Sequence, residues 1–244
     1  MRRLKLTVAV GLTVALGVAT LAYGDGVSEN TAYVDGSIKP KKLDPKKRTP
    51  IALFSGVRTE TDSVDGTQAN PEAELIEYDA DGKWKSTAAP FCTANIETPG
   101  LTVDQARDLC PPKSYIGSGE AEVALNDSAR ISDITVSVFN GPAKNQVRLH
   151  TSSPTLGPAA PTVFGEVIKS KSRKYGPALL VADAPDAGGD AFMITKFNAT
   201  IFRSSGISLF RCASKQVNIR RTVTYDDGSQ ERATDSSKCK QKKS

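Results

Sequence analysis

The segment ISDITVSVF, residues 131–139, is the clearest alternating stretch of the chain. Ile134, Val136 and Val138 fall on one side of an extended backbone, and the Thr and Ser between them fall on the other. A sheet with one buried face requires this period of two. The segment therefore predicts a β-strand with one side in an apolar core.

Similar stretches recur along the chain, separated at short intervals by Gly, Pro, Asn and Asp. This pattern is typical of an all-β protein, and we expect a β-sandwich of the Ig-like or jelly-roll-like type. The predicted strands cover residues 51–59, 72–78, 116–125, 131–139, 146–151, 162–168, 178–182, 192–203, 207–212 and 217–225.

Two local signals refine this outline. The turn sequence YDDGS, residues 225–229, predicts a hairpin, because Asp-Gly tolerates the positive φ angles of tight turns. Thr102 and Gln105 have the spacing of a capping box, and Pro111 follows shortly after. We expect one short helix here, inside the loop between Cys92 and Cys110.

The N-terminus has the form of a cleavable signal peptide. Three basic residues, Arg2, Arg3 and Lys5, precede an uncharged apolar run over residues 6–21. That run is shorter than the roughly 20 residues that span a bilayer. We predict a signal peptide over residues 1–24, export by the general secretory route and no membrane anchor in the mature chain, which is then secreted or associated with the cell wall.

Removal of the signal lowers the formal net charge from +5 to about +2. The remaining length suits one large domain. We expect an N-terminal extension or linker over residues 25–49, a single domain over residues 50–239 and a basic tail over residues 240–244.

The four cysteines are interpreted as structural, because an exported chain meets oxidising conditions. Three pairings are open, and the sequence alone does not choose among them. We favour Cys92 with Cys110 and Cys212 with Cys239, since each pair closes a short local loop.

The stretch over residues 37–50 is the most biased of the chain. Lysines and prolines of this kind often form a linker or protect the edge of a sheet. The alternative is contact with a polyanion such as an acidic cell-wall polymer, and Lys238, Lys240, Lys242 and Lys243 would join that patch if the tail folds back. The candidate contact residues are Lys39, Lys41, Lys42, Lys46, Lys47 and Arg48.

No motif predicts a catalytic, cofactor or metal site. The one histidine, His150, is interpreted as structural, and Gly117-Ser118-Gly119 as a strand entry or bulge. Residues 79–82, Asp-Ala-Asp-Gly, are interpreted as a turn, because Pro90 stands where a calcium loop needs its last acidic ligand. A pair of carboxylates for glycoside hydrolysis needs only to meet in space, so that alternative stays open.

Aromatic residues are few for a sugar-binding protein. Trp84 is the one tryptophan, and Tyr78 lies near it in sequence. Both are candidates for stacking on a ligand if they are exposed, and core residues if they are buried.

The order of several landmarks resembles a group of uncharacterised secreted bacterial proteins. The resemblance spans roughly residues 50–240 and implies one exported β-rich domain with two local disulfides; it carries over no catalytic residues. It departs from the group where Val217 and Ile219 stand in place of a tryptophan. The landmarks are Phe91-Cys92, the helix ending at Cys110-Pro111, Gly117-Ser118-Gly119-Glu120-Ala121, Phe139-Asn140-Gly141, His150, Phe164-Gly165, Cys212, Tyr225-Asp226-Asp227-Gly228 and Cys239.

From these features we expect a secreted or wall-associated module that binds or supports rather than catalyses. It has no cofactor, and its partner is a cell-wall polymer or another polyanion rather than a specific nucleic acid. The alternative is a secreted carbohydrate-active enzyme or other hydrolase on the same scaffold.

Overall fold

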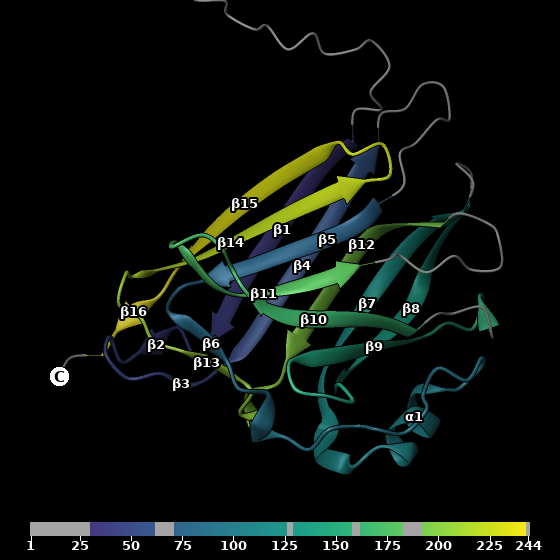
Figure 1. Cartoon of the computed structure of the whole chain (residues 1–244), viewed down its shortest axis with the longest axis horizontal. Helices are drawn as coiled ribbons and strands as arrows, with labels where there is room; N and C mark the ends of the chain where they lie inside the picture. Colours follow the sequence, from purple (N-terminus) through teal and green to yellow (C-terminus); the bar gives the residue numbers. More distant parts are fainter. Residues whose placement is uncertain (1–29, 62–70, 126–128, 158–161, 183–191, 243–244) are drawn as a thin grey trace, which may run out of the picture.

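The computed structural model describes residues 30–61, 71–125, 129–157, 162–182 and 192–242 (Figure 1). The predicted signal peptide lies outside these residues. One α-helix is present among them, α1 (Val103–Leu109). The strands are β1 (Asn30–Lys39), β2 (Lys42–Leu43), β3 (Thr49–Pro50), β4 (Ala52–Thr61), β5 (Pro71–Asp79), β6 (Gly82–Trp84), β7 (Tyr115–Leu125), β8 (Ala129–Asn140), β9 (Gln146–Ser152), β10 (Thr162–Lys169), β11 (Tyr175–Ala182), β12 (Phe192–Ile201), β13 (Ser208–Phe210), β14 (Gln216–Tyr225), β15 (Gln230–Lys238) and β16 (Lys240–Gln241).

Eleven of these strands form one sheet in the order β1-β4-β12-β7-β8-β9-β10-β11-β5-β14-β15. Every neighbouring pair in it is antiparallel. The all-β class is thus confirmed, and the strands share a single sheet that is nearly closed. The Ig-like or jelly-roll-like sandwich type is not confirmed.

The number of strands determines how the sheet closes. In an antiparallel series of eleven, the first and last strands run in the same direction. β1 and β15 lie side by side in this way, without forming a ladder of their own. Instead, the backbone N–H of Gly36 donates to the Asp235 carboxylate across a distance of 3.2 Å. A side chain thus replaces a missing strand-to-strand hydrogen bond.

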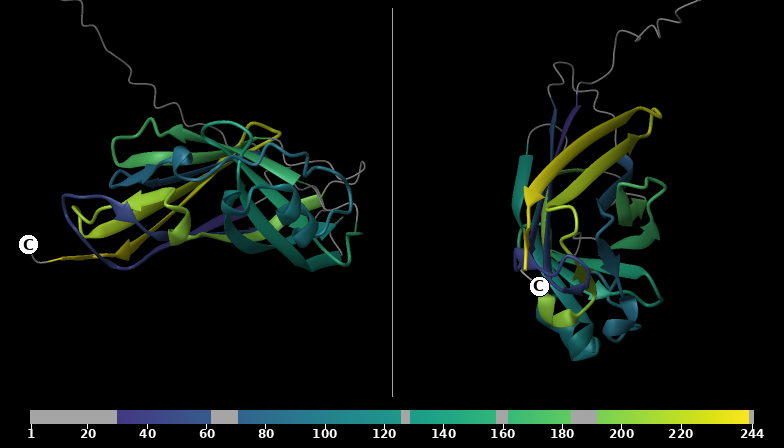
Figure 2. Two further views of the ribbon diagram at one scale, coloured as in Figure 1. Left: turned by 90° about the horizontal axis from the view of Figure 1, so that it is seen from below. Right: turned by 90° about the vertical axis from the view of Figure 1, so that its left-hand side faces the viewer.

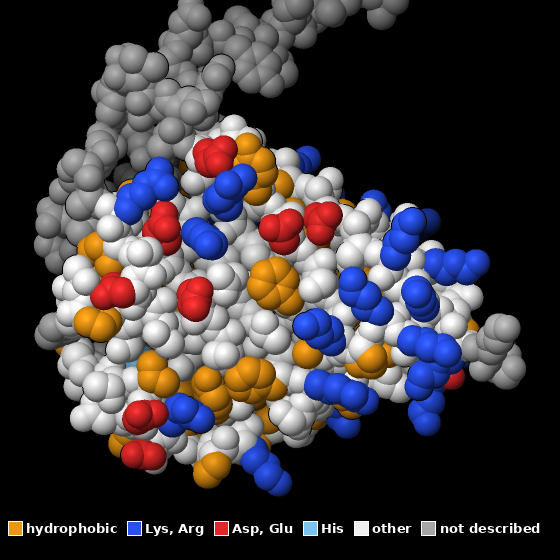
Figure 3. Space-filling model, turned by 180° about the vertical axis from the view of Figure 1, so that it is seen from behind, with side chains coloured by type: hydrophobic (Ala, Val, Ile, Leu, Met, Phe, Trp, Pro, Cys, Tyr) orange, Lys and Arg blue, Asp and Glu red, His pale blue; other side chains and the backbone are white. Residues whose placement is uncertain are grey.

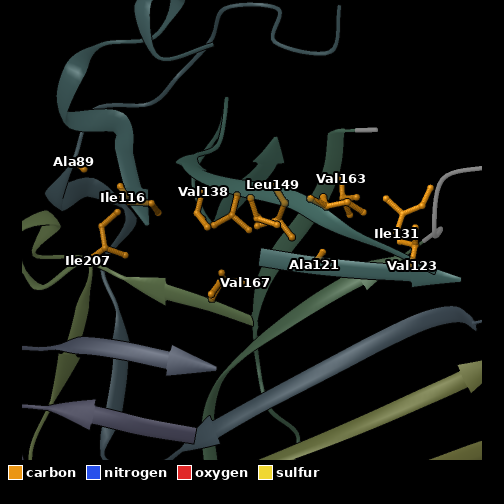
Figure 4. Close-up of a cluster of buried hydrophobic side chains, with 14 residues drawn as sticks. Ala89, Ile116, Ala121, Val123, Ile131, Val138, Leu149, Val163, Val167 and Ile207 are labelled. Atoms are coloured by element: carbon orange, nitrogen blue, oxygen red, sulfur yellow. The ribbon is translucent and has the colours of Figure 1, made fainter. Parts of the chain in front are cut away.

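The core lies between the two walls of the closed sheet, which face each other in Figure 2. Alternate residues of β7, β8, β9 and β10 point inward, and Val138, Leu149 and Val167 meet there (Figure 4). A second cluster joins Val34 of β1 to Ile219 of β14. The nearly closed sheet therefore buries most of the inward residues of its strands, as the alternation predicts.

Two small sheets cover one end of the large one. They consist of β3, β13 and β6, and of β2 and β16. Ile38, Leu43 and Ile51 pack beneath them against the Cys212–Cys239 bridge. Both disulfides pair as predicted, because Cys92 is bonded to Cys110.

All ten predicted strands are present, as β4, β5 and β7 through β14, although β13 is shorter than expected. Thr102 and Gln105 form the predicted capping box at α1. The β14–β15 hairpin turns at Gly228, whose φ is +80°. The structure differs over residues 30–39, which we expected in an extension or linker: they form β1 and pair with β4 over ten positions.

We predict that Asp235→Ala weakens the closure of the sheet. The variant leaves the Gly36 N–H without its charged acceptor, which should lower the free energy of unfolding by about 1 to 2 kcal/mol in urea titrations. Hydrogen exchange should accelerate in β1 and stay unchanged in β8.

The control is Thr234→Ala, which alters the neighbouring exposed side chain on the opposite face of β15. Equal effects of the two substitutions on unfolding and on exchange in β1 would contradict the role of Asp235.

Candidate functional site

Two basic segments from opposite ends of the chain meet at one end of the sheet. β16 pairs in parallel with β2. The N–H of Lys240 donates to the Lys41 carbonyl at 2.7 Å, and that of Lys242 to the Leu43 carbonyl at 2.8 Å. The tail therefore folds back beside the first segment. We call this surface the basic end; it comprises Lys39, Lys41, Lys42, Lys46, Lys47, Lys215, Lys238, Lys240 and Lys242, all exposed (Figure 3, right-hand side).

The closure of the sheet explains this meeting. Because β1 and β15 run in the same direction, their C-terminal ends lie at the same end of the molecule. The Cys212–Cys239 bridge then holds the tail in place. The N–H of Cys212 donates to the Asp44 carbonyl, and that of Cys239 to the Lys215 carbonyl.

Lys42 and Lys240 are direct partners in the register of β2 and β16. Side chains in register on parallel strands share one face, and neighbouring strands lie about 4.8 Å apart. Both ammonium groups are exposed on that face. Like charges placed opposite one another destabilise a sheet, so an anion lying between the two ammonium groups would relieve their mutual repulsion.

Acidic partners are scarce at the basic end. Every salt bridge of the described residues is made by an arginine, so none involves these lysines. Asp44 is the acid within the segment, and it accepts the backbone N–H groups of Lys46 and Lys47. These hydrogen bonds, with the charge of Lys242 nearby, hold the pKa of Asp44 below its usual value. The ammonium groups are left to solvent or to a ligand.

Arg48 differs from the other candidate contact residues. Its guanidinium donates to the backbone carbonyls of Ala80 and Asp81 and is thereby occupied. Residues 79–82 form a turn between β5 and β6, as the sequence indicated. The Asp79 carboxylate accepts from Asn218, and Asp81 is paired with Arg211 at 2.8 Å. Arg48 and both aspartates therefore organise this end of the fold.

His150 lies on the outer face of β9, where it fastens the Cys92–Cys110 loop to the sheet. Its Nε2 lies 3.1 Å from the Leu101 carbonyl, and its Nδ1 lies 3.3 Å from the hydroxyl of Thr162. Arg148 makes a similar contact, because it donates to the Ala94 carbonyl. Burial lowers the pKa of His150, and the backbone hydrogen bonds only partly oppose that shift. The imidazole is thus buried in a structural contact.

Trp84 and Tyr78, the candidates for stacking, both line a cavity of about 60 Å³ inside the sheet. The Tyr78 hydroxyl lies 2.9 Å from that of Ser55, and burial raises the Tyr78 pKa to about 12. Sites for small molecules usually measure about 300–1,000 Å³. These aromatic side chains therefore contribute to the core.

A larger hollow lies on the outer face of the sheet. This outer groove has a volume of about 440 Å³. Glu77 in its floor accepts hydrogen bonds from Ser170 and from Arg220. Burial tends to raise the pKa of Glu77, but those hydrogen bonds and the charge of Arg220 outweigh it, and the pKa is lowered. The groove is lined by Ala73, Leu75, Glu77, Ile168, Lys169, Ser170, Lys171, Ala178, Leu180, Arg220, Thr222, Thr224, Gln230 and Arg232.

The outer groove bears on the hydrolase alternative. Glycoside hydrolysis requires two carboxyl groups on opposite sides of the scissile bond. Of the described residues that line the groove, Glu77 alone is acidic, and Arg220 pairs with it. The groove therefore does not favour that alternative.

Gly117 and Gly119 belong to β7, and a register shift against β8 lies at Gly117, as the interpretation of a strand entry or bulge anticipated. A Cβ atom at Gly119 would lie 1.8 Å from the Asn198 carbonyl oxygen. The close approach of β12 thus explains the glycine.

Sequence reasoning missed Lys215 and all the charged residues of the outer groove. Lys215 is separated from the other lysines of the basic end along the chain, and the disulfide brings it there. Arg220 and Arg232 lie on the outward sides of β14 and β15. The alternation did not reveal which side of β15 faces outward, because its inward residues include the charged Glu231 and Asp235 instead of apolar side chains.

No protein-family model matches this chain, and no curated protein matches it in sequence. Among the described residues, no helix has the length and apolar character to cross a membrane. Nor do those residues include a group of three or more His, Cys, Asp or Glu side chains that could hold a metal ion. The basic end and the outer groove are the two candidate functional surfaces of the described residues.

We predict that acid weakens the protein through His150. Its lowered pKa means that the unfolded chain binds a proton first as the pH falls below about 6.5, the ordinary histidine value, so the free energy of unfolding should decrease from there. Urea titrations at pH 7.5 and 5.5 should show a smaller decrease for His150→Gln than for the native protein.

Thr162→Val is the matched control, because it removes the neighbouring hydroxyl without removing a titrating group. It should keep the native pH dependence. An unchanged decrease in His150→Gln would rule out the histidine as its source.

Proposed function

We propose that this chain is an exported, non-catalytic module that binds a polyanionic polymer at its basic end. The observation that carries the proposal is the register of β2 and β16, which places Lys42 opposite Lys240. A polymer with regularly spaced anions would relieve the repulsion between such lysines. It would also gain affinity by releasing its condensed counterions.

Rigidity supports a role in binding. The lysines of the basic end are carried on a backbone that is tied by two parallel strands, a disulfide and a buried apolar cluster. Their positions are therefore set before the polymer arrives, which lowers the entropy lost on binding. A flexible lysine-rich tail would lack this advantage.

Export is the second part of the proposal. It is supported by the signal-like sequence over residues 1–24 and by two disulfides, which persist in oxidising compartments. An acidic polymer of the cell wall is then the partner that such a protein would meet. The facing walls of the sheet support the description of the exported domain as a flattened β-sandwich.

We predict that substituting Lys42, Lys240 and Lys242 together with Gln weakens retention on immobilised heparin. The variant should elute from the heparin column at a lower salt concentration than the native protein. On the scale of nucleic acids, each lost contact reduces the slope of log K against log salt by about 0.7 to 0.9. Binding measured at several salt concentrations gives this slope.

The control substitutes Lys113, Lys144 and Lys196, which are exposed elsewhere, and removes the same charge. If both triple variants lose equal retention, net charge rather than the basic end drives binding, and the proposal fails.

Wall association has its own test. Washed cells that produce the protein should retain the native form and release it at high salt, whereas the variant at Lys42, Lys240 and Lys242 should be found in the medium. Native protein that appears only in the medium would contradict association with the wall.

A further inference from the structure

The outer groove is a hollow on the face of the sheet away from the core. β11, β5 and β14 form its floor, and they lie side by side in Figure 1. One side is formed by the end of β10 with Lys169, Ser170 and Lys171, and the other by Gln230 and Arg232 of β15. Its volume, about 440 Å³, lies within the range of small-molecule sites.

Two contacts fix the position of the Arg220 side chain in this groove. Its Nε donates to the buried Glu77 carboxylate, and its guanidinium lies 4.7 Å from the centre of the Tyr175 ring. The side chain is 29% exposed, and among the described residues no hydrogen bond occupies its two Nη groups. A guanidinium in this state can bind an oxyanion with both groups at once.

The charge of the groove also favours an anion. Lys169, Lys171 and Arg232 are exposed at its sides. Among the described lining residues Glu77 is the one carboxylate, and it is already paired. Arg232 is ordered by its hydrogen bond to the Gln230 amide, which in turn donates to Thr224.

The rest of the lining suits the body of a sugar. Thr222, Thr224 and Gln230 offer hydrogen bonds to hydroxyl groups, and Leu75 and Leu180 offer apolar surface to C–H groups. The described residues of the lining include no aromatic side chain. Proteins that bind single-stranded nucleic acid stack its bases on such side chains, so a polynucleotide is the poorer match.

A row of polar side chains leads from the groove to the basic end. The outward residues of β14 and β15 are cationic or carry an amide or hydroxyl, and none is acidic. From Gln230 to Lys238 the row extends for about 27 Å. The members are Gln216, Asn218, Arg220, Thr222 and Thr224 of β14, and Gln230, Arg232, Thr234, Ser236 and Lys238 of β15.

We propose that the outer groove binds one uronate unit of an acidic polysaccharide, whose adjoining units follow the β14–β15 row to the basic end. The uronate carboxylate pairs with Arg220 and Arg232, and its ring lies over Leu75 and Leu180. This assignment rests on the proposed function for the course of the longer chain, whereas the groove itself is a separate site.

Isothermal titration with a disaccharide of two linked glucuronates tests the groove alone. The native protein should bind it and should not bind cellobiose, which is neutral. The double variant Lys169→Gln and Arg232→Gln should bind the diglucuronate about tenfold more weakly, as expected for one or two lost charge-assisted hydrogen bonds at a partly exposed site. A double variant at Lys113 and Lys144 removes the same charge elsewhere and should keep the native affinity.

Ala73→Phe separates shape from charge, because it fills the floor of the groove without changing a charge. It should abolish measurable diglucuronate binding, and it should reduce heparin retention less than the variant at Lys42, Lys240 and Lys242 does. The proposal is overturned if the native protein does not bind diglucuronate, if cellobiose binds equally well, or if Ala73→Phe binds like the native protein.

Longer ligands test the course of the chain. The variant at Lys42, Lys240 and Lys242 should bind diglucuronate normally and bind a glucuronate chain that spans the row more weakly. Normal heparin retention without diglucuronate binding would end the groove proposal alone, whereas unchanged retention in the lysine variant would end the proposed function alone. Equal affinity for oligothymidylate would overturn the assignment to polysaccharide.

Discussion

The hydrogen bond from the Gly36 N–H to the Asp235 carboxylate marks the constraint on which the molecule depends. Eleven antiparallel strands cannot close with an antiparallel pair, since the first and last point the same way. In this protein the carboxylates of the last strand, β15, point inward and accept backbone hydrogen bonds from β1, where a strand-to-strand ladder would otherwise form. Burial raises the pKa of Glu231 on the same side of β15, despite hydrogen bonds from Tyr225 and the Ala32 backbone. The contact between β1 and β15, which we call the seam, therefore contains acidic side chains that an apolar core would exclude.

The seam also leaves the acidic side chains of β15 on its inner side and the basic ones on its outer side. β15 carries Glu231 and Asp235 on its inner side, so its outer side is free of acids. Because β1 and β15 run in parallel, the basic sequences that follow them lie at one end, where β2 and β16 pair. One constraint thus accounts for both the cationic end and the acid-free row beside it. The binding surface is a consequence of how the sheet closes.

Much of the fold could be predicted from local patterns. Alternation identified ten strands because most of their inward residues are apolar, and the capping box at Thr102 located α1 because its contacts are local. β1 was not predicted, since it leads into the lysine- and proline-rich stretch, which suits a linker, and its partner β4 begins only after that stretch. The outer groove was not predicted either, because Glu77, Ser170 and Arg220 come from three separate parts of the chain and meet only when β5, β14 and the end of β10 are placed together.

The sequence by itself determined the all-β class, the helix and the existence of two lysine-rich segments, and it favoured the local disulfide loops. These features depend on neighbours along the chain, where periodicity and capping act over a few residues. Only the tertiary structure decided that the sheet nearly closes, that Trp84 and Tyr78 line its interior, and that Lys42 lies opposite Lys240. Those outcomes depend on strand order and direction, which arise from long-range pairing and leave no local pattern in the chain.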